Sequence, residues 1–423
     1  MKRCYVVVAI MLGVLLAGCA GKGNRGEVTL HLSNWGGADD DPVYARKIDG
    51  LYRQFERENP GIRLEIESVP DEYVQKMILS FVAGTAPDVL SLDASSAGVF
   101  INNGVLQDLS PLAAGDPTFK ASDYWANVLA IDQRGKALYA VPGDFTPLVL
   151  YYNKKLFDRA HVPYPSGVWT FQQFLEVARK LTLRDSSGRV IQYGYNFTNW
   201  MPGWIVWLWN NGGDVLTPDG GRAKGALDSP QNVASITFLR DLVLKEKVSP
   251  DLSQTAATGV DPFGNGQTAM EISGHWELTS FKTAPKLKLS DVGVAQAPTN
   301  LPKGRTVMYE VGFAIPKQAR HPKESWKLIK YLTGHLYQQA YQQTGIAVCG
   351  RKDVANERAT DPREQQFLNL VPTARGPWGA QVVGYDFVEQ EGKKMMERVL
   401  AGTDPKQALS EMADRIDSYF KVR

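Results

Sequence analysis

The chain has 423 residues, of which 22% are charged and 43% are hydrophobic, and its formal net charge is +2. Because acidic and basic residues nearly balance and no basic run stands out, we do not expect nucleic acid or an anionic membrane surface as a partner. A chain of this length exceeds what a single hydrophobic core usually supports, which favours two lobes with a core each.

The first residues have the layout of a secretory signal. A basic start precedes an apolar run from Tyr5 to Leu16, which is shorter than the roughly 20 residues that a membrane-spanning helix needs. Leu16-Ala17-Gly18-Cys19 resembles the bacterial lipobox, in which cleavage leaves an acylated cysteine at the new N-terminus. We therefore predict a signal peptide at 1–18 and a lipid on Cys19, with an ordinary signal and an incidental cysteine as the alternative.

Residues 19–27 are small and polar and predict a flexible tether between the lipid and the folded body. Their G-x-G-x-x-G pattern is taken as chance, because a dinucleotide fingerprint must follow a strand and open a helix. Cys4 leaves with the signal and Cys19 carries the lipid, so only Cys349 remains in the body and no internal disulfide is expected. The anchor predicts a location outside the cytoplasm, in a periplasm or on the outer face of the cell membrane.

Strands and helices alternate along the first hundred residues of the body. Their periodicity predicts strands at 28–32, 62–66 and 89–92, and helices from Asp41-Pro42 to about residue 58 and over 71–83. This alternation favours a parallel α/β sheet with right-handed crossovers. Ligands of such sheets bind beyond the carboxyl ends of the strands, here at Ser33–Gly37 and Asp93–Ser96.

Further along, an apolar strand at 139–142 is expected to be interrupted at 143–147 by hinge-like residues and to resume at 148–152. Thr170 is the predicted cap of a helix over 171–181. A tryptophan-rich segment then precedes Gly212-Gly213. The later chain is expected to contain helices over 322–343, 381–400 and 405–420.

Read in order, several short motifs resemble the family 1 extracellular solute-binding proteins, the maltose-binding-protein-like group that serves ABC importers. Each motif is weak alone, but together they span nearly the whole body behind a lipobox. They are Val28 to Trp35, Phe55-Glu56-Arg57-Glu58-Asn59-Pro60-Gly61-Ile62, Gly84-Thr85-Ala86-Pro87-Asp88-Val89, Asn103-Gly104-Val105-Leu106-Gln107-Asp108-Leu109, Tyr139-Ala140-Val141-Pro142, Tyr151-Tyr152-Asn153-Lys154-Lys155-Leu156-Phe157, Trp169-Thr170-Phe171 and Phe263-Gly264-Asn265-Gly266-Gln267-Thr268-Ala269-Met270.

The resemblance implies a periplasmic-binding-protein type II fold, in which two α/β lobes joined by hinge strands close around a ligand. It also implies a monomeric, non-enzymatic receptor without a cofactor, which binds a carbohydrate and delivers it to an ABC permease. The expected lobes are 28–143 with 313–350, and 148–309 with 351–423, with hinges near 144–147 and 310–312.

A sugar cleft needs aromatic rings for the apolar C–H faces of the ligand. By resemblance, Trp276 matches the stacking tryptophan of the family, and Trp200 and Trp204 lie nearest its cleft. Trp378 stands where a second platform is often found, and Trp35 ends the first strand. For all five the alternative is core packing, since tryptophan is often largely buried and an apolar helix face is usually core.

The same cleft needs polar groups for the hydroxyls. Asp93 ends the third strand, Asp144 lies in the first expected hinge, and Glu310 interrupts a strand-like stretch at the second. A charge there is costly without a partner, so Glu310 is either a ligand contact or paired with an arginine. For Arg375, a ligand contact and an exposed surface position are equal alternatives. The family often has a small or glycine-rich pair where Glu310-Val311 stands, so this sequence departs from the pattern there.

No metal site is predicted. Asp39-Asp40-Asp41 suits a helix N-terminus better than calcium, and the five histidines lack zinc-like spacing. Three other functions stay open: a glycosidase using two of the carboxylates as acid and base, the same fold with a glycerophosphodiester ligand, and a receptor that serves a sensor in place of a permease. We find no serine-hydrolase elbow, P-loop or zinc-protease motif, which disfavours an enzyme.

Overall fold

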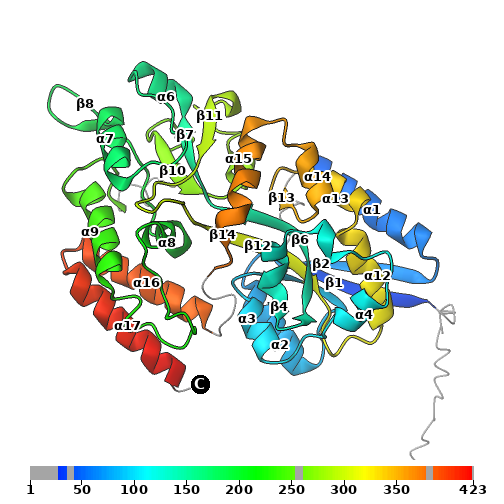
Figure 1. Cartoon of the computed structure of the whole chain (residues 1–423). Helices are drawn as coiled ribbons and strands as arrows, with labels where there is room; N and C mark the ends of the chain where they lie inside the picture. Colours follow the sequence, from blue (N-terminus) through cyan, green and yellow to red (C-terminus); the bar gives the residue numbers. More distant parts are fainter. Residues whose placement is uncertain (1–26, 36–41, 253–260, 378–383, 422–423) are drawn as a thin grey trace, which may run out of the picture.

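The computed structural model describes residues 27–35, 42–252, 261–377 and 384–421. The predicted signal peptide, Cys19 and all of the tether except Glu27 lie outside these ranges, as do Asp39 to Asp41 and Trp378. Two main sheets with helices around them make up the described chain (Figure 1). This is the mixed α/β class that the sequence predicts.

The larger sheet has seven strands in the order β13-β6-β12-β3-β1-β2, with β14 paired to β12. Strand β1 is parallel to β2 and β3, whereas β12 is antiparallel to β3 and β6. The strands are β1 (Val28–Asn34), β2 (Ile62–Ser68), β3 (Val89–Asp93), β6 (Ala140–Pro147), β12 (Thr306–Ala314), β13 (Val348–Cys349) and β14 (Ala374–Arg375).

The smaller sheet has β7 (Val149–Asn153) at its centre, antiparallel to β10 (Met270–Ser273) and β11 (Val292–Ala295). The remaining described strands pair as two ribbons, β4 (Gln133–Arg134) with β5 (Ala137–Leu138) and β8 (Leu183–Arg184) with β9 (Val190–Gln192).

Helices cover both sheets. Around the larger sheet lie α1 (Pro42–Glu58), α2 (Tyr73–Ala83), α3 (Ala97–Asn102), α4 (Ser110–Ala114), α5 (Ala126–Leu129), α12 (Pro322–Leu332), α13 (His335–Gln342) and α14 (Lys352–Glu357). The others are α6 (Lys154–Arg159), α7 (Phe171–Leu181), α8 (Met201–Trp209), α9 (Pro230–Leu244), α11 (Glu277–Ser280), α15 (Pro362–Leu370), α16 (Tyr385–Leu400) and α17 (Pro405–Lys421). Short 3₁₀ turns are η1 (Ala121–Asp123), η2 (Ala130–Asp132), η3 (Leu289–Asp291) and η4 (Val371–Thr373).

Both faces of the larger sheet are buried. Along β3, Val89 belongs to one core and its neighbours Leu90 and Leu92 to another, because successive strand residues point to opposite faces. Phe55 and Trp326 cover the first face, whereas Phe81 and Phe100 cover the second. Burial on both sides explains why β3 has apolar residues at adjacent positions, Val89 and Leu90.

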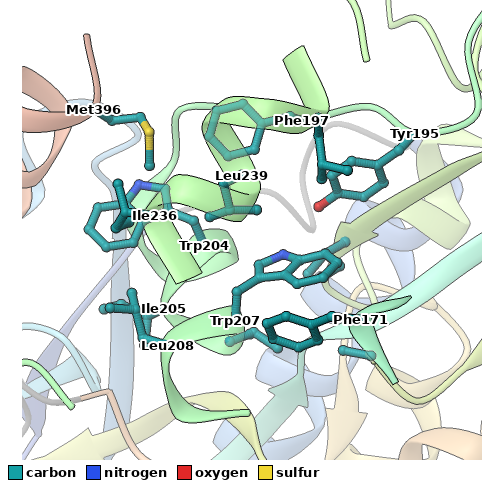
Figure 2. Packing of buried hydrophobic residues seen from close by; sticks show 14 of the residues in the cluster. Phe171, Tyr195, Phe197, Trp204, Ile205, Trp207, Leu208, Ile236, Leu239 and Met396 are labelled. Atoms are coloured by element: carbon teal, nitrogen blue, oxygen red, sulfur yellow. The ribbon is translucent and has the colours of Figure 1, made fainter. Parts of the chain in front are cut away.

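A separate core surrounds α8. Trp204, Trp207 and Trp209 are each 1% exposed or less, and they pack among aromatic and aliphatic side chains of α7, α9 and α16 (Figure 2). A helix that is apolar on every side is a buried helix, and the sequence Met-Pro-Gly-Trp-Ile-Val-Trp-Leu-Trp fits this rule. The predicted cap of α7 is confirmed, since Thr170 and Gln173 form a reciprocal capping box.

Three expectations need correction. Strand β6 continues through Pro147, because Gly143 forms a bulge against β12 without ending the strand, and the break comes at Leu148. Glu310 lies inside β12 and does not interrupt it. The single helix expected over 322–343 is two helices, since the chain turns at Thr333 and Gly334 between α12 and α13.

Candidate functional site

A cavity of about 350 Å³ lies beside the larger sheet. This volume is near the lower end of the roughly 300–1,000 Å³ typical of small-molecule sites. Helix α13 and the residues that follow it also line the cavity, as do Trp200 before α8 and Trp276 after β10. Asn34, Trp35 and Asp93, at the carboxyl ends of β1 and β3, line it, as expected for an α/β sheet. The other lining residues are Ile48, Tyr52, Ile66, Ser91, Gly143, Asp144, Thr146, Trp200, Trp276, Tyr309, Glu310, Val311, Phe313, Tyr337, Gln338, Tyr341, Ile346 and Ala347.

Aromatic rings form much of the wall. Trp200 lies edge-on to Trp276 at 6.0 Å between ring centroids and stacks at 6.1 Å with Tyr309. Trp200 and Trp276 are only partly buried, and each directly precedes a helix, α8 and α11 respectively. Across the cavity, the Trp35 ring lies 4.2 Å from that of Tyr73. These rings hold one another in place and leave faces available to a ligand.

Two aspartates lie on either side of Val311. In the sheet, Val311 of β12 pairs with Asp93 of β3 on one side and with Asp144 of β6 on the other. Directly opposed residues project to the same face of a sheet, and all three residues line the cavity. Two strand spacings separate the aspartates, so their Cα atoms are roughly 10 Å apart.

Both aspartates line the cavity and are only partly exposed. Burial raises the pKa of Asp144 to about 7, although Tyr341 Oη donates a 2.7 Å hydrogen bond to it. Burial also raises the pKa of Asp93, against hydrogen bonds donated by the Ser95 amide and hydroxyl. Among the described residues, none that lines this cavity is a lysine, arginine or histidine.

Glu310 is adjacent to Val311 in β12, so its side chain projects to the opposite face of the sheet from Asp93 and Asp144, where its partner is Asp132. The Glu310 and Asp132 side chains are 0% exposed, and no hydrogen-bond donor reaches any of their four carboxyl oxygens among the described residues. A Cβ atom placed on Gly312 would lie 2.8 Å from Glu310 Oε1 and 2.9 Å from Asp132 Oδ2, so the two groups converge. Burial raises the pKa of both, to about 7 for Asp132 and well above the usual range for Glu310. A shared proton explains how the pair is satisfied.

The structure brings six of the predicted site residues together. Trp35, Asp93, Asp144, Trp200, Trp276 and Glu310 all line the cavity. Contact of these residues with a ligand stays a prediction.

Two predicted residues do not line the cavity. Trp204 is 1% exposed and packs beside Ile236 and Met396, so its apolar surface is used by the core (Figure 2). Arg375 pairs with Asp214 at 3.1 Å, and its guanidinium stacks 4.4 Å from the Trp209 ring centroid. We withdraw both as ligand contacts.

Among the residues of this site that the sequence analysis missed are four tyrosines and one acid. Tyr52, Tyr309, Tyr337 and Tyr341 line the cavity, and Asp132 lies behind Glu310. Tyr337 and Tyr341 are four residues apart and share a helical face, so their spacing was a usable signal. Asp132, at the end of η2, carried no signal.

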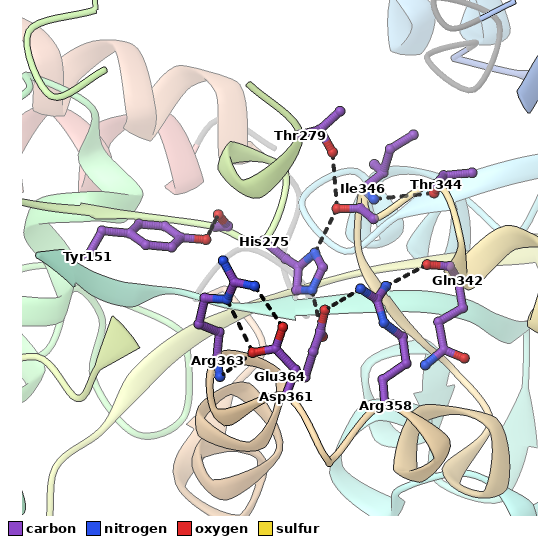
Figure 3. Close-up of polar contacts among 12 residues, drawn as sticks. Tyr151, His275, Thr279, Gln342, Thr344, Ile346, Arg358, Asp361, Arg363 and Glu364 are labelled. Carbon is purple, nitrogen blue, oxygen red and sulfur yellow. Dashed lines mark hydrogen bonds and ion pairs between the residues drawn. The ribbon is translucent and has the colours of Figure 1, made fainter. Parts of the chain in front are cut away.

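A buried polar network holds the segment that leads into Ile346 and Ala347 (Figure 3). The ring of His275 lies 2.9 Å from Gly345 O through Nδ1 and 2.9 Å from Glu364 Oε2 through Nε2. Arg358 pairs with Glu364 at 2.9 Å and donates to Gln342 O at 2.7 Å. Because His275 directly precedes Trp276, this network links Trp276 to the segment that carries Ile346 and Ala347.

Within the described ranges, no three histidine, cysteine or acidic side chains are arranged to hold a metal ion. The same residues include no helix with the length and hydrophobicity needed to span a membrane.

The family model for bacterial extracellular solute-binding proteins matches residues 36–339. The chain belongs to this family. Its members are binding proteins and not a class of enzymes.

Solved structures share the fold. An ABC substrate-binding protein of Listeria monocytogenes, solved with cycloalternan, has a TM-score of 0.81 at 22% identity and covers 93% of this chain and 99% of its own. The sugar-binding protein MalE of Xanthomonas citri also has a TM-score of 0.81, at 20% identity over 94% and 98% of the two chains. These likenesses establish the type II periplasmic-binding-protein fold.

One curated relative is similar over most of its length. The maltooligosaccharide ABC transporter solute-binding lipoprotein of Streptococcus pneumoniae is 27% identical over 351 residues, which cover 78% of this chain and 77% of the relative.

Proposed function

We propose that this protein is a receptor that binds a carbohydrate, of di- or oligosaccharide size, and delivers it to the permease of an ABC importer. The observation that carries the proposal is the cavity lining, where tryptophan and tyrosine rings stand beside carboxyl groups. Aromatic faces pack against the C–H faces of a sugar, and carboxylates accept hydrogen bonds from its hydroxyls. The cycloalternan complex of the Listeria protein and the name of the Streptococcus relative support the same ligand class.

A glycerophosphodiester is the alternative ligand. A phosphate group is usually bound by arginine or lysine, and neither residue lines the cavity in the part of the chain that the structure describes. Acidic groups such as Asp93 and Asp144 would instead repel it. The lining therefore favours a ligand without negative charge.

We also propose the lobe division expected from the sequence, 28–143 with 313–350 and 148–309 with 351–423, with hinges near 144–147 and 310–312. The separate cores around the larger sheet and around α8 support it. Closure of the lobes around the ligand would bring Trp200 and Trp276 toward Asp93 and Asp144.

We further propose that Cys19 is acylated and holds the receptor, a monomer, at the outer face of the cell membrane or in a periplasm. Cell fractionation tests this. The Cys19→Ser variant is expected to move from the membrane fraction to the soluble fraction, and its retention in the membrane would contradict the anchor.

A thermal-shift screen of residues 20–423 tests the ligand class. Neutral mono- and oligosaccharides form one set of ligands, and glycerol phosphates and glycerophosphodiesters form the contrasting set. A ligand at one hundred times its dissociation constant stabilises the native state by about 2.7 kcal/mol, which raises the melting midpoint.

The matched variants are Trp276→Ala and Tyr164→Ala. Tyr164 is a 41% exposed aromatic residue outside the cavity. We expect a sugar to shift the midpoint in the native chain and in Tyr164→Ala but not in Trp276→Ala. A shift by phosphorylated ligands alone would overturn the carbohydrate assignment.

A further inference from the structure

The cavity has an unbalanced charge. Among the described residues that line it, Asp93 and Asp144 have acidic side chains on the cavity face and none is a lysine, arginine or histidine. The Glu310 carboxyl is 0% exposed and lies with Asp132 on the opposite face of β12. The charged groups that act on Asp144 and Asp93 are themselves carboxyls, namely Asp93 for the former and Asp386 for the latter. Apart from a bound proton, the ligand is therefore the remaining source of compensating positive charge for these two carboxyls among the groups described.

A neutral sugar satisfies only part of this arrangement. Each hydroxyl donates one hydrogen bond and leaves the negative charge of its acceptor in a poorly solvated site, which is costly. A protonated amine donates up to three hydrogen bonds and also brings the opposite charge. Because Asp93 and Asp144 face the cavity from both sides of Val311, an ammonium group between them can bond to both.

The aromatic wall suits the same ligand. The faces of tryptophan and tyrosine rings attract cations as well as sugar C–H groups. Trp200, Trp276 and Tyr309 lie together in one cluster. A cyclic ligand can therefore stack on these rings while its ammonium group contacts the aspartates.

We propose that the preferred ligand is a saccharide that carries a protonated amine, an amino sugar or an aminocyclitol-containing saccharide, with its ammonium group held between Asp93 and Asp144. This inference rests on the proposed function and narrows its ligand class.

Proton release accompanies such binding. Burial raises the pKa of Asp144 to about 7, so part of this group is protonated at neutral pH. An adjacent ammonium favours the carboxylate, and binding therefore expels protons, whereas a neutral sugar expels few. Among the described residues, Asp93, Glu310, Tyr337, Tyr341 and Cys349 interact electrostatically with Asp144, and none of them brings a positive charge.

Isothermal titration calorimetry with matched ligands tests the proposal. The probes are glucose, galactose and mannose, the corresponding 2-amino sugars and their N-acetyl forms, together with cellobiose, the glucosamine disaccharide and its diacetyl form. Within each set, only the amine carries a charge. Titration in phosphate and in Tris buffers measures the protons released.

The variants are Asp93→Asn and Asp144→Asn, with Asp49→Asn as the control on an exposed face of α1. Thermal midpoints and circular dichroism establish that each variant is folded. We expect at least one amine to bind about tenfold or more tighter than its neutral counterparts, a preference that both cavity variants lower about tenfold and the control preserves.

The outcomes separate this inference from the proposed function. Binding of neutral sugars as tight as that of the amines, or an amine preference that survives both cavity variants, overturns the inference and leaves a sugar receptor. Failure of every amine to bind also overturns it. Binding of glycerophosphodiesters alone overturns both.

Discussion

The buried carboxyl pair of Asp132 and Glu310 predicts an unusual dependence of stability on pH. The folded-state pKa of Asp132 is raised to about 7, mainly by burial, from an unfolded value of 3.8. The folded protein therefore holds a proton that the unfolded chain releases, and stability that is present at low pH is lost as the pH rises toward 7. At no more than about 1.36 kcal/mol for each pH unit, and with a slope that flattens near the folded-state pKa, the loss between pH 5 and pH 7 is about 2 kcal/mol.

Asp132→Asn removes this titration and keeps the shape of the side chain. Its amide can donate to Glu310, so the variant remains satisfied. We expect the free energy of unfolding of the variant, relative to the native chain, to rise by about 2–3 kcal/mol between pH 5 and pH 8. Groups other than Glu310 titrate equally in both proteins and cancel in this difference, whereas the pKa of Glu310 falls when its acidic neighbour is removed but stays raised by burial.

Urea unfolding followed by tryptophan fluorescence measures the effect at pH 5, 6, 7 and 8. Asp49→Asn, which changes an exposed carboxyl, is the control. If the stability curves of Asp132→Asn and the native chain run parallel from pH 5 to pH 8, the burial argument for this pair is refuted.

Three further substitutions test the placement of residues. Trp204→Phe is expected to destabilise by about 1–3 kcal/mol in urea unfolding while ligand affinity changes less than about twofold, and a tenfold loss would return Trp204 to the site. Arg375→Ala should cost under about 1 kcal/mol and leave calorimetric affinity unchanged, since its ion pair is exposed. Gly143→Ala places a Cβ atom 2.7 Å from Phe313 Cε2, so we expect a loss of about 1–3 kcal/mol; an unchanged urea midpoint would contradict this.

The fold follows closely from local patterns. Periodicity located β1, β2 and β3 and the helices between them, and the side chains at Thr170 identified the start of α7. Because parallel strands end at the same edge, the positions of Asn34, Trp35 and Asp93 were also predictable. These signals are short-range, or depend only on strand direction.

Errors arose where a local pattern has two physical outcomes. The apolar face of α8 could have lined a cleft or a core, and only the packing of α9 and α16 decides that Trp204 is core. Gly143 suggested a break, but a glycine also permits a bulge, and the pairing with β12 selects the bulge.

The carboxyl pair shows the limit most clearly. Glu310 stood out because a charge inside an apolar strand needs a partner, and the expected partner was an arginine. The structure supplies another acid, Asp132, from η2, and a proton takes the place of the cation. The sequence indicated that Glu310 needs a partner but not which one. A proton is not encoded by any residue, so compensation by a proton could not be predicted from the sequence. Asp93 and Asp144 also lack a cationic partner among the described residues, and we assign the compensating charge to the ligand. The proposed ligand specificity therefore rests on the cavity and not on a sequence motif.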